Sequence, residues 1–138
     1  MRNINFRVWD NEQQEYLHTD ILHIKNDGTL FVSKKGENPW SALLSGECDS
    51  ERFVIEQYTG LKGKNGTKIY EGDIVKYSDG YSDCIGKVYY DCDSACFNVS
   101  GFYNGSQDYP TLAFSEYGNA TMEVIGNIHE NYELLRKK

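Results

Sequence analysis

The chain has 138 residues, a length that suits one domain and that buries enough surface to form a core without disulfide or metal staples. Aromatic side chains make up 14%, mostly tyrosine, and 13 glycines accompany only 2 prolines, a composition typical of short strands joined by glycine turns. The formal net charge of −7 disfavours generic binding to nucleic acid, because an acidic surface repels the phosphate backbone.

The N-terminal segment predicts a strand and no targeting signal. Residues 1–10 contain no apolar run of signal-peptide length, and no part of the chain approaches the ~20 apolar residues of a membrane helix. We therefore expect a soluble, cytoplasmic protein. Apolar and polar side chains alternate over residues 4–9, as in a half-buried β-strand.

A hairpin is predicted next. Residues 15–24 suit a returning strand, and the sequence NDGT at 26–29 is a strong turn signal because its glycine can take a positive φ. Residues 30–33 then provide the partner strand. The segment 34–50 has the composition of a loop, with room for a short helix that begins at Pro39.

The most patterned stretch is YTGLKGKNGTKIYEGDIVKY, residues 58–77. A phosphate-binding loop requires G-x-x-x-x-G-K-[ST] followed by a helix, whereas an alternating, strand-like run follows here. Tight turns alone explain the glycines, so we interpret the stretch as structural. The residues expected to form turns here and near the C-terminus are Gly60, Gly66, Glu71, Gly72, Asp73, Gly126 and Asn127.

The remainder of the chain predicts further short strands, at residues 53–58, 68–70, 74–77, 86–90, 97–102 and 122–128. The tail suits a short helix, since Glu130 lies near its start and basic residues at its end complement the helix dipole. Many short strands between turn signals predict a mainly β fold, either a barrel or a sandwich.

The acidic excess is local. Residues 77–123 contain seven acidic side chains against one base, Lys87, and ten of the 19 aromatic residues. One interpretation is a solvated acidic face over a tyrosine-rich core. The other is a contact surface for a basic partner, because aromatic and charged side chains together suit recognition. The candidate residues of such a surface are Tyr81, Asp91, Asp93, Tyr103, Asp108 and Tyr109.

No pattern in the sequence predicts a catalytic, cofactor or metal site. Cys92 and Cys96 are spaced too loosely for a zinc knuckle, Cys48 and Cys84 are isolated, and His18 and His23 lie five positions apart. Reduced, partly buried thiols are the simplest interpretation in a cytoplasmic protein. His129 follows no nucleophile signature, so a surface histidine is expected there.

Four segments in this order resemble the YopX family, small proteins of bacteriophages and prophages: NFRVWD at 5–10, QYTGLK at 57–62, IYEGDIV at 69–75 and VIGNIHEN at 124–131. The resemblance covers both ends and the middle of the chain. Residues 34–56 and 91–121, which hold three of the four cysteines, look particular to this protein.

The resemblance implies a mainly β protein encoded by phage or prophage DNA, with no activity or catalytic residue to transfer. YEGDIV also resembles the entry into a small SH3-like barrel. We therefore expect a barrel-type region at 57–138 packed with N-terminal strands at 1–56, as one compact unit with few short helices. Asp73 is expected to accept backbone hydrogen bonds in its turn, with a ligand contact as the alternative.

The expected function is that of a non-catalytic accessory protein that binds an unidentified protein partner or assembles with itself. The alternative is a nucleic-acid-linked regulator, including an acidic protein that competes with DNA for a host protein. Small β-barrels often bind nucleic acids, but the acidic balance disfavours direct binding here. A hydrolase built on Cys92 and His129 is a third hypothesis, and no cofactor, metal or membrane role is expected.

Overall fold

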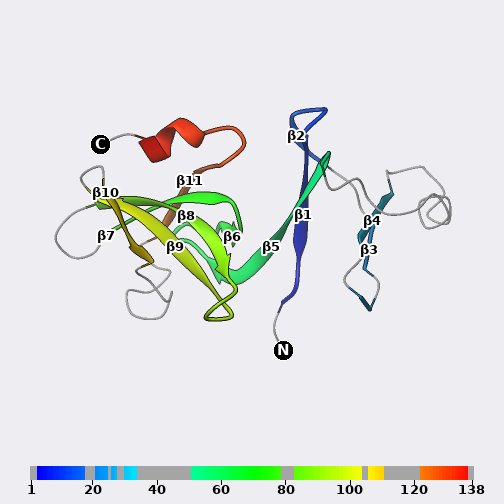
Figure 1. Cartoon of the computed structure of the whole chain (residues 1–138), viewed down its shortest axis with the longest axis horizontal. Helices are drawn as coiled ribbons and strands as arrows, with labels where there is room; N and C mark the ends of the chain where they lie inside the picture. Colours follow the sequence, from blue (N-terminus) through cyan, green and yellow to red (C-terminus); the bar gives the residue numbers. More distant parts are fainter. Residues whose placement is uncertain are drawn as a thin grey trace. The chain divides into compact units, whose positions relative to one another are not determined.

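A computed structural model describes residues 3–17, 21–24, 26–27, 30–33, 51–78, 83–103, 106–110 and 122–136, with only the backbone described at 21–24, 30–33, 78, 101–103, 106–110 and 136. All but one of the regular elements in these ranges are strands, and the exception is a single 3-10 helix (Figure 1). The mainly β fold predicted from the sequence is therefore confirmed. No helix in the described ranges is long and apolar enough to cross a membrane.

The chain divides into two compact units, one formed by residues 1–6 and 56–138 and the other by residues 7–55. The two boundaries fall within strands, one between residues 6 and 7 of β1 (Phe6–Asp10) and one between residues 55 and 56 of β5 (Phe53–Lys62). The division at residues 56 and 57 into an N-terminal and a barrel-like region stays a prediction, as does the SH3-like character of the barrel. The predicted helix at Pro39 lies outside the described residues.

The smaller unit contains two hairpins. In the first, β1 (Phe6–Asp10) pairs antiparallel with β2 (Glu15–Tyr16), and Trp9 faces Tyr16 with ring centroids 4.9 Å apart. In the second, β3 (Ile21–Ile24) pairs antiparallel with β4 (Leu30–Ser33), which is the predicted hairpin pairing, and residues 26–27 lie in a turn. The single strand expected over 15–24 is therefore two strands, β2 and β3.

Hydrogen bonds to Asp10 connect the first hairpin to Arg52, the residue that precedes β5. The Asp10 carboxylate accepts hydrogen bonds from Arg52 Nε and Nη2, both at 3.0 Å, and from the backbone N–H groups of Glu12 and Gln13. The side chain of Asp10 is fully buried. The hydrogen bonds from Arg52 outweigh the desolvation of the carboxyl group and lower the pKa of Asp10 to about 2.

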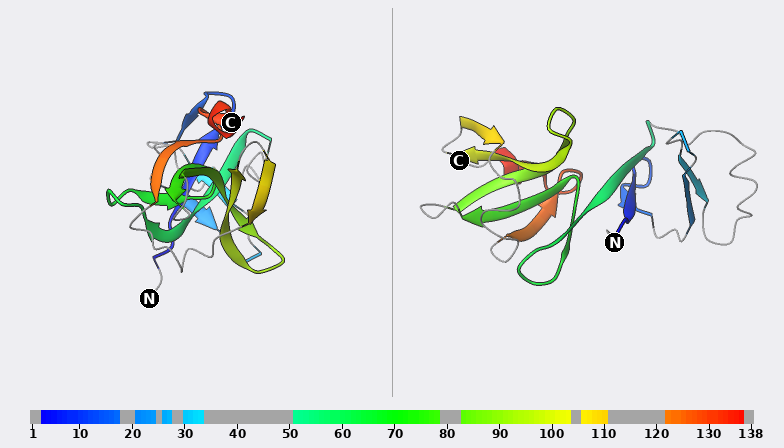
Figure 2. Two further views of the ribbon diagram at one scale, coloured as in Figure 1. Left: turned by 90° about the vertical axis from the view of Figure 1, so that its left-hand side faces the viewer. Right: turned by 90° about the horizontal axis from the view of Figure 1, so that it is seen from below.

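The larger unit is built on a five-stranded antiparallel sheet, in which β9, β8 and β7 are the inner strands between the edge strands β10 and β11 (Figures 1 and 2). Its strand order is β10-β9-β8-β7-β11, made of β7 (Asp73–Ser78), β8 (Asp83–Asp91), β9 (Cys96–Tyr103), β10 (Ser106–Pro110) and β11 (Glu123–Asn127). The strand β10 was not predicted, because its sequence SQDYP is polar and ends in proline.

Three further elements complete this unit. The end of β5 pairs with β6 (Lys68–Tyr70), and the pairing register shifts between Tyr58 and Lys62, where Gly60 has a φ of 92°. The predicted C-terminal helix is a 3-10 helix, η2 (Tyr132–Arg136), that begins later than the sequence pattern indicated. Leu135 of this helix is buried.

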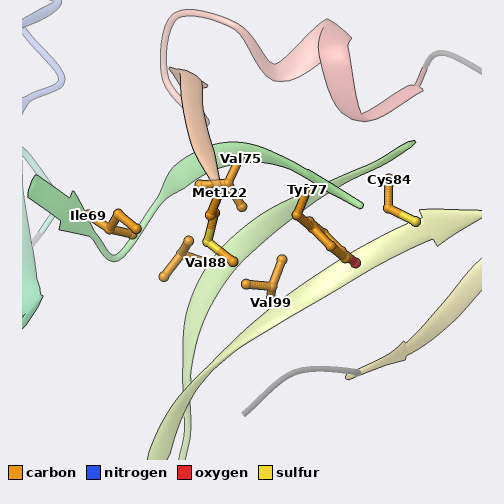
Figure 3. Packing of buried hydrophobic residues seen from close by; sticks show 7 residues of the cluster. All are labelled: Ile69, Val75, Tyr77, Cys84, Val88, Val99 and Met122. Atoms are coloured by element: carbon orange, nitrogen blue, oxygen red, sulfur yellow. The ribbon is translucent and has the colours of Figure 1, made fainter. Parts of the chain in front are cut away.

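The core of the larger unit lies on one face of the sheet (Figure 3). Val75 and Val99 are completely buried, and Val88 between them is 1% exposed. Since buried and more exposed residues alternate along β8, the strand presents one face to this core. The buried cluster consists of Ile69, Val75, Tyr77, Cys84, Val88, Val99 and Met122.

The charge of Asp10 makes the smaller unit acid-sensitive. A carboxyl group whose pKa is lowered on folding stabilises the protein above its unfolded pKa of 3.8 and loses that contribution as the pH falls through about 2. We expect the Asp10→Asn variant to lose less stability than the wild type between pH 5 and pH 2.5. Urea unfolding followed by circular dichroism measures this difference. Glu15→Gln, at an exposed residue of β2, is the control and should follow the wild type; equal acid sensitivity of Asp10→Asn and wild type would contradict the assignment.

Candidate functional site

Three hydrogen bonds stabilise the turn between β6 and β7. The backbone N–H of Gly72 donates to Val88 O on β8 at 2.9 Å, and the backbone N–H of Ile128 donates to Gly72 O at 2.9 Å. Within the turn, Tyr70 N donates to Asp73 Oδ2 at 2.8 Å, which is the backbone contact expected of Asp73. Strands from distant parts of the sequence therefore meet at Gly72.

Two features favour glycine at position 72. Its φ of 81° lies in the left-handed region that other residues rarely adopt. A Cβ atom there would lie 2.6 Å from Glu56 Oε2, so the Glu56 carboxylate occupies the space that a side chain would need. Gly66 has a similar φ of 76° but open space around it.

Glu56 forms a nearly buried pair with His129. The distance between Glu56 Oε1 and His129 Nε2 is 2.7 Å, and the two side chains are 4% and 11% exposed. This contact joins β5 to the segment after β11, across 73 positions of the sequence. His129 is therefore not the surface histidine that the sequence pattern indicated.

Asn127 positions His129 for this contact. Its Oδ1 accepts hydrogen bonds from the backbone N–H groups of His129 and Glu130, both at 3.0 Å, and its backbone N–H donates to Asn131 Oδ1. A Cβ atom on Gly126 would lie 2.5 Å from Asn131 Oδ1, so glycine leaves room for that side chain. The motif GNIHEN is thus a turn that directs His129 toward Glu56.

Beside this pair, the surface of the larger unit has an open groove of about 450 Å³. Two aromatic side chains on paired strands form part of its lining: Tyr90 on β8 and Phe97 on β9, with ring centroids 5.3 Å apart and planes at 71°. Tyr90 is 43% exposed. The lining residues are Gln57, Glu71, Tyr90, Ala95, Cys96 and Phe97.

Glu71 supplies the carboxyl group of the groove. Burial raises its pKa, and the nearby carboxylate of Glu56 raises it further, while a hydrogen bond from Gln57 N to Glu71 Oε1 at 2.9 Å acts in the opposite direction. In return, Glu71 N donates to Gln57 O at 3.0 Å. The reciprocal bonds fix Glu71 at the wall of the groove in a setting that disfavours an uncompensated negative charge.

The β8–β9 turn contributes Ala95 to the groove lining, and the Asp91 carboxylate stabilises this turn. Asp91 Oδ2 accepts hydrogen bonds from Ser94 Oγ at 2.7 Å and from Asn98 Nδ2 at 3.2 Å, and Oδ1 accepts one from Asp93 N. The bond from Ser94 is the main reason that the pKa of Asp91 is lowered. Ala95 takes a φ of 54° at the end of this turn.

The structure brings only part of the predicted partner surface near the groove. Asp91 and Asp93 lie in the turn next to Ala95 and Cys96, and Asp93 is exposed. Tyr103 lies at the end of β9, and Asp108 and Tyr109 lie on β10, where only the backbone is described. Tyr81 lies outside the described residues. Sequence reasoning missed Gln57, Ala95 and Cys96, which carry no local signal for a binding site.

The cysteines and histidines do not converge in the described part of the chain, and no group of three potential metal ligands occurs there. Cys84 is buried in the core, whereas Cys92 and Cys96 are exposed and reduced. Cys96 Sγ lies 3.2 Å from Ser94 Oγ and donates to Asn98 Oδ1 at 3.7 Å. Cys48 and His18 lie outside the described residues.

Comparisons with known proteins agree with the motifs quoted above. The family model described as "YopX protein" matches residues 5–136. The "SPbeta prophage-derived uncharacterized protein YopX" of Bacillus subtilis (strain 168) is 31% identical over 137 residues, which cover 96% of each chain.

Two crystal structures are similar to the whole chain. Protein YopX from Bacillus subtilis has a TM-score of 0.61 and is 27% identical, with 100% of this chain and 99% of that chain covered. Protein EF1440 from Enterococcus faecalis has a TM-score of 0.57 and is also 27% identical, with 98% of this chain and 99% of that chain covered.

The contact between Glu56 and Gly72 predicts a difference between two glycine substitutions. Gly66→Ala and Gly72→Ala incur a similar positive-φ strain of roughly 1–2 kcal/mol. Only Gly72→Ala also meets the Glu56 carboxylate, which adds about 1–3 kcal/mol of overpacking. Urea unfolding should show the larger loss for Gly72→Ala. The excess should shrink in a Glu56→Ser background, and an excess that persists there would show that the contact is not its cause.

The Glu56–His129 pair predicts a coupled loss of stability. His129→Leu leaves the buried Glu56 carboxylate without this hydrogen bond, which should cost about 1–3 kcal/mol. Glu56→Leu alone should also be destabilising, and the double variant should lose less than the sum of the two single losses. A double-mutant cycle of urea unfolding free energies measures the coupling. Strict additivity would mean that the two side chains do not stabilise each other.

Proposed function

The chain belongs to the YopX family, and we propose that it is a phage- or prophage-encoded accessory protein that binds a protein partner through the groove beside Glu71, without catalysis. The relative from Bacillus subtilis is named as prophage-derived, which supports such an origin for this chain. The bacterial host cytoplasm is the proposed place of action.

The exposed ring of Tyr90 carries this proposal. Tyr90 lies on β8, the central strand of the five-stranded sheet, and pairs with Phe97 on β9, yet 43% of Tyr90 stays accessible to solvent. Tyrosine is among the residues that contribute most binding energy in protein interfaces, where it anchors in a pocket surrounded by polar groups. Here the surrounding polar groups are Glu71 and Gln57.

The lining of the groove favours a protein over a nucleic acid. None of its six described residues is basic, whereas proteins that bind single strands combine stacking rings with a positively charged surface. Residues 77–123 contain seven acidic residues and one lysine. This acidic segment supports a second candidate function, in which the protein competes with DNA for a host protein. That function also requires a protein partner, so the same capture experiment reports on it.

Affinity capture with groove variants tests the proposal. The tagged full-length chain is incubated with nuclease-treated host lysate, and bound proteins are identified by mass spectrometry. We expect one stoichiometric partner, recovered at least about tenfold less with Tyr90→Ala, as for an interface anchor. The matched control is Tyr132→Ala, at a tyrosine that is 51% exposed and does not line the groove.

The outcomes separate the candidates. Equal recovery of a partner by the wild type, Tyr90→Ala and Tyr132→Ala would place binding away from the groove and contradict the proposal. A homo-oligomer in light scattering that dissociates on Tyr90→Ala would replace it with self-assembly. Displacement of the captured partner by duplex DNA would favour competition with DNA as the specific role.

A further inference from the structure

The tip of the β5–β6 hairpin, residues 62–68, is a basic feature of an acidic chain. We infer that this tip binds an acidic segment of a protein partner, whose carboxylates pair with the ammonium groups of Lys62 and Lys68. The inference goes beyond the function proposed above, since no residue of the groove lining belongs to residues 62–68. The local charge, the strand register and the bonds that fix the tip each support it.

The charge at the tip is opposite to that of the chain. Residues 57–70 contain three lysines, Lys62, Lys64 and Lys68, and no acidic residue, whereas the whole chain carries a formal net charge of −7. All three lysines are exposed. At physiological ionic strength an exposed charge acts over about 8 Å, so these lysines, and not the distant acidic residues, govern the attraction of a small ligand to the tip.

The strand register places two of these lysines side by side. Lys62 on β5 is paired directly with Lys68 on β6, and directly paired residues point to the same face of a sheet. Like charges in this position destabilise the pairing of the strands. Neither ammonium group forms an ion pair with a carboxylate in the described part of the chain. A carboxylate of a partner between the two lysines would relieve their repulsion.

Hydrogen bonds fix the tip before any ligand binds. Gly63 N donates to Thr67 O across the hairpin at 2.8 Å. Lys64 connects the tip to the start of β11, because its backbone N–H donates to Met122 O at 2.8 Å and its ammonium group pairs with Glu123 at 3.1 Å. The tip therefore loses little conformational entropy on binding, which favours recognition.

An aromatic ring positions Lys68. Its ammonium nitrogen lies 5.3 Å from the centroid of the Tyr58 ring, and Tyr58 is buried. This cation–π contact orients the ammonium group without pairing it with an anion. Since an ammonium group has three N–H donors, Lys68 can bond a carboxylate while it stays over the ring.

Two lysines suit a short acidic segment better than a nucleic acid. Binding to a nucleic-acid backbone draws its strength from many phosphate contacts, and an extended strand would also meet the acidic residues of this chain. An acidic segment of a protein has to place only one or two carboxylates at the tip, where they provide specificity while the rest of the interface provides affinity. Aspartate and glutamate side chains are therefore the expected ligands.

Titration of the ¹⁵N-labelled full-length chain tests this inference. The probe is the peptide Ac-Gly-Asp-Glu-Asp-Gly-NH₂, and the matched neutral peptide is Ac-Gly-Asn-Gln-Asn-Gly-NH₂. Amide NMR signals of residues 62–68 report binding. We expect saturable shifts with the acidic peptide and roughly tenfold weaker binding of the neutral peptide, because two exposed ion pairs are lost.

Lysine variants assign the binding to the tip. Lys62→Gln and Lys68→Gln should each weaken binding of the acidic peptide about two- to fivefold, as expected for the loss of one exposed ion pair. Lys87→Gln is the matched control, because it removes the same charge from β8, outside the tip, and should leave the affinity unchanged.

A stability measurement separates a binding surface from an ordinary solvated one. Lys62→Glu replaces the like-charged pair with opposite charges, so the urea concentration at the midpoint of unfolding should rise. The same variant should bind the acidic peptide more weakly than the wild type does. A pair of lysines without a binding role would change stability alone.

Three results would overturn the inference. The first is equal affinity for the acidic and the neutral peptide, and the second is an affinity that the double variant Lys62→Gln, Lys68→Gln leaves unchanged. The third is tighter binding of a short oligothymidylate than of the acidic peptide at residues 62–68, which would assign the tip to nucleic acid. None of these results bears on the groove, because the tip variants leave its lining residues in place.

Discussion

The absence of a side chain at Gly72 is the constraint on which the larger unit depends. The space beside its Cα is filled by the Glu56 carboxylate, its N–H is bonded to β8, and its carbonyl oxygen is bonded to the segment after β11. Three strands that are far apart in the sequence can meet there only because the turn takes a positive φ and carries no Cβ. The position of His129, and of Glu71 at the groove, follows from that meeting point.

This arrangement places the carboxyl groups of Glu56 and Glu71 near each other, which makes it unfavourable for both to carry a negative charge. Glu56 is compensated by His129 at 2.7 Å, whereas Glu71 has a raised pKa because burial and Glu56 both disfavour its charge. A buried or half-buried acid is weak evidence for stability, since apolar residues of similar volume often do as well. Glu71 is also one of the polar residues beside the Tyr90 ring in the groove, where the proposed function places the partner.

The fold was largely predictable from the sequence, and the site was not. The alternation of buried and exposed residues along β8 and the NDGT and NG turn sequences are local patterns of a few residues. Such patterns predict strands and turns directly from the sequence. The groove combines Gln57, Glu71 and Ala95, which come together because the β6–β7 turn is hydrogen-bonded to β5 and β8 and because β8 pairs with β9. The Glu56–His129 contact spans 73 positions, and the left-handed conformation of Ala95 has no sequence signal at all.

The structure also changes what the local acidic excess means. Asp91 was a candidate for a partner surface because it is one of seven acids in a segment with a single lysine. Its carboxylate accepts hydrogen bonds from Asp93 N and Ser94 Oγ in the β8–β9 turn and from Asn98 Nδ2 on β9, so it stabilises the turn that contributes Ala95 to the groove. Glu71, which seemed only a turn residue, is the carboxylate that the fold presents beside an exposed aromatic ring. For the proposed function, the acidic residue that lines the groove therefore matters more than the number of acidic residues in the segment.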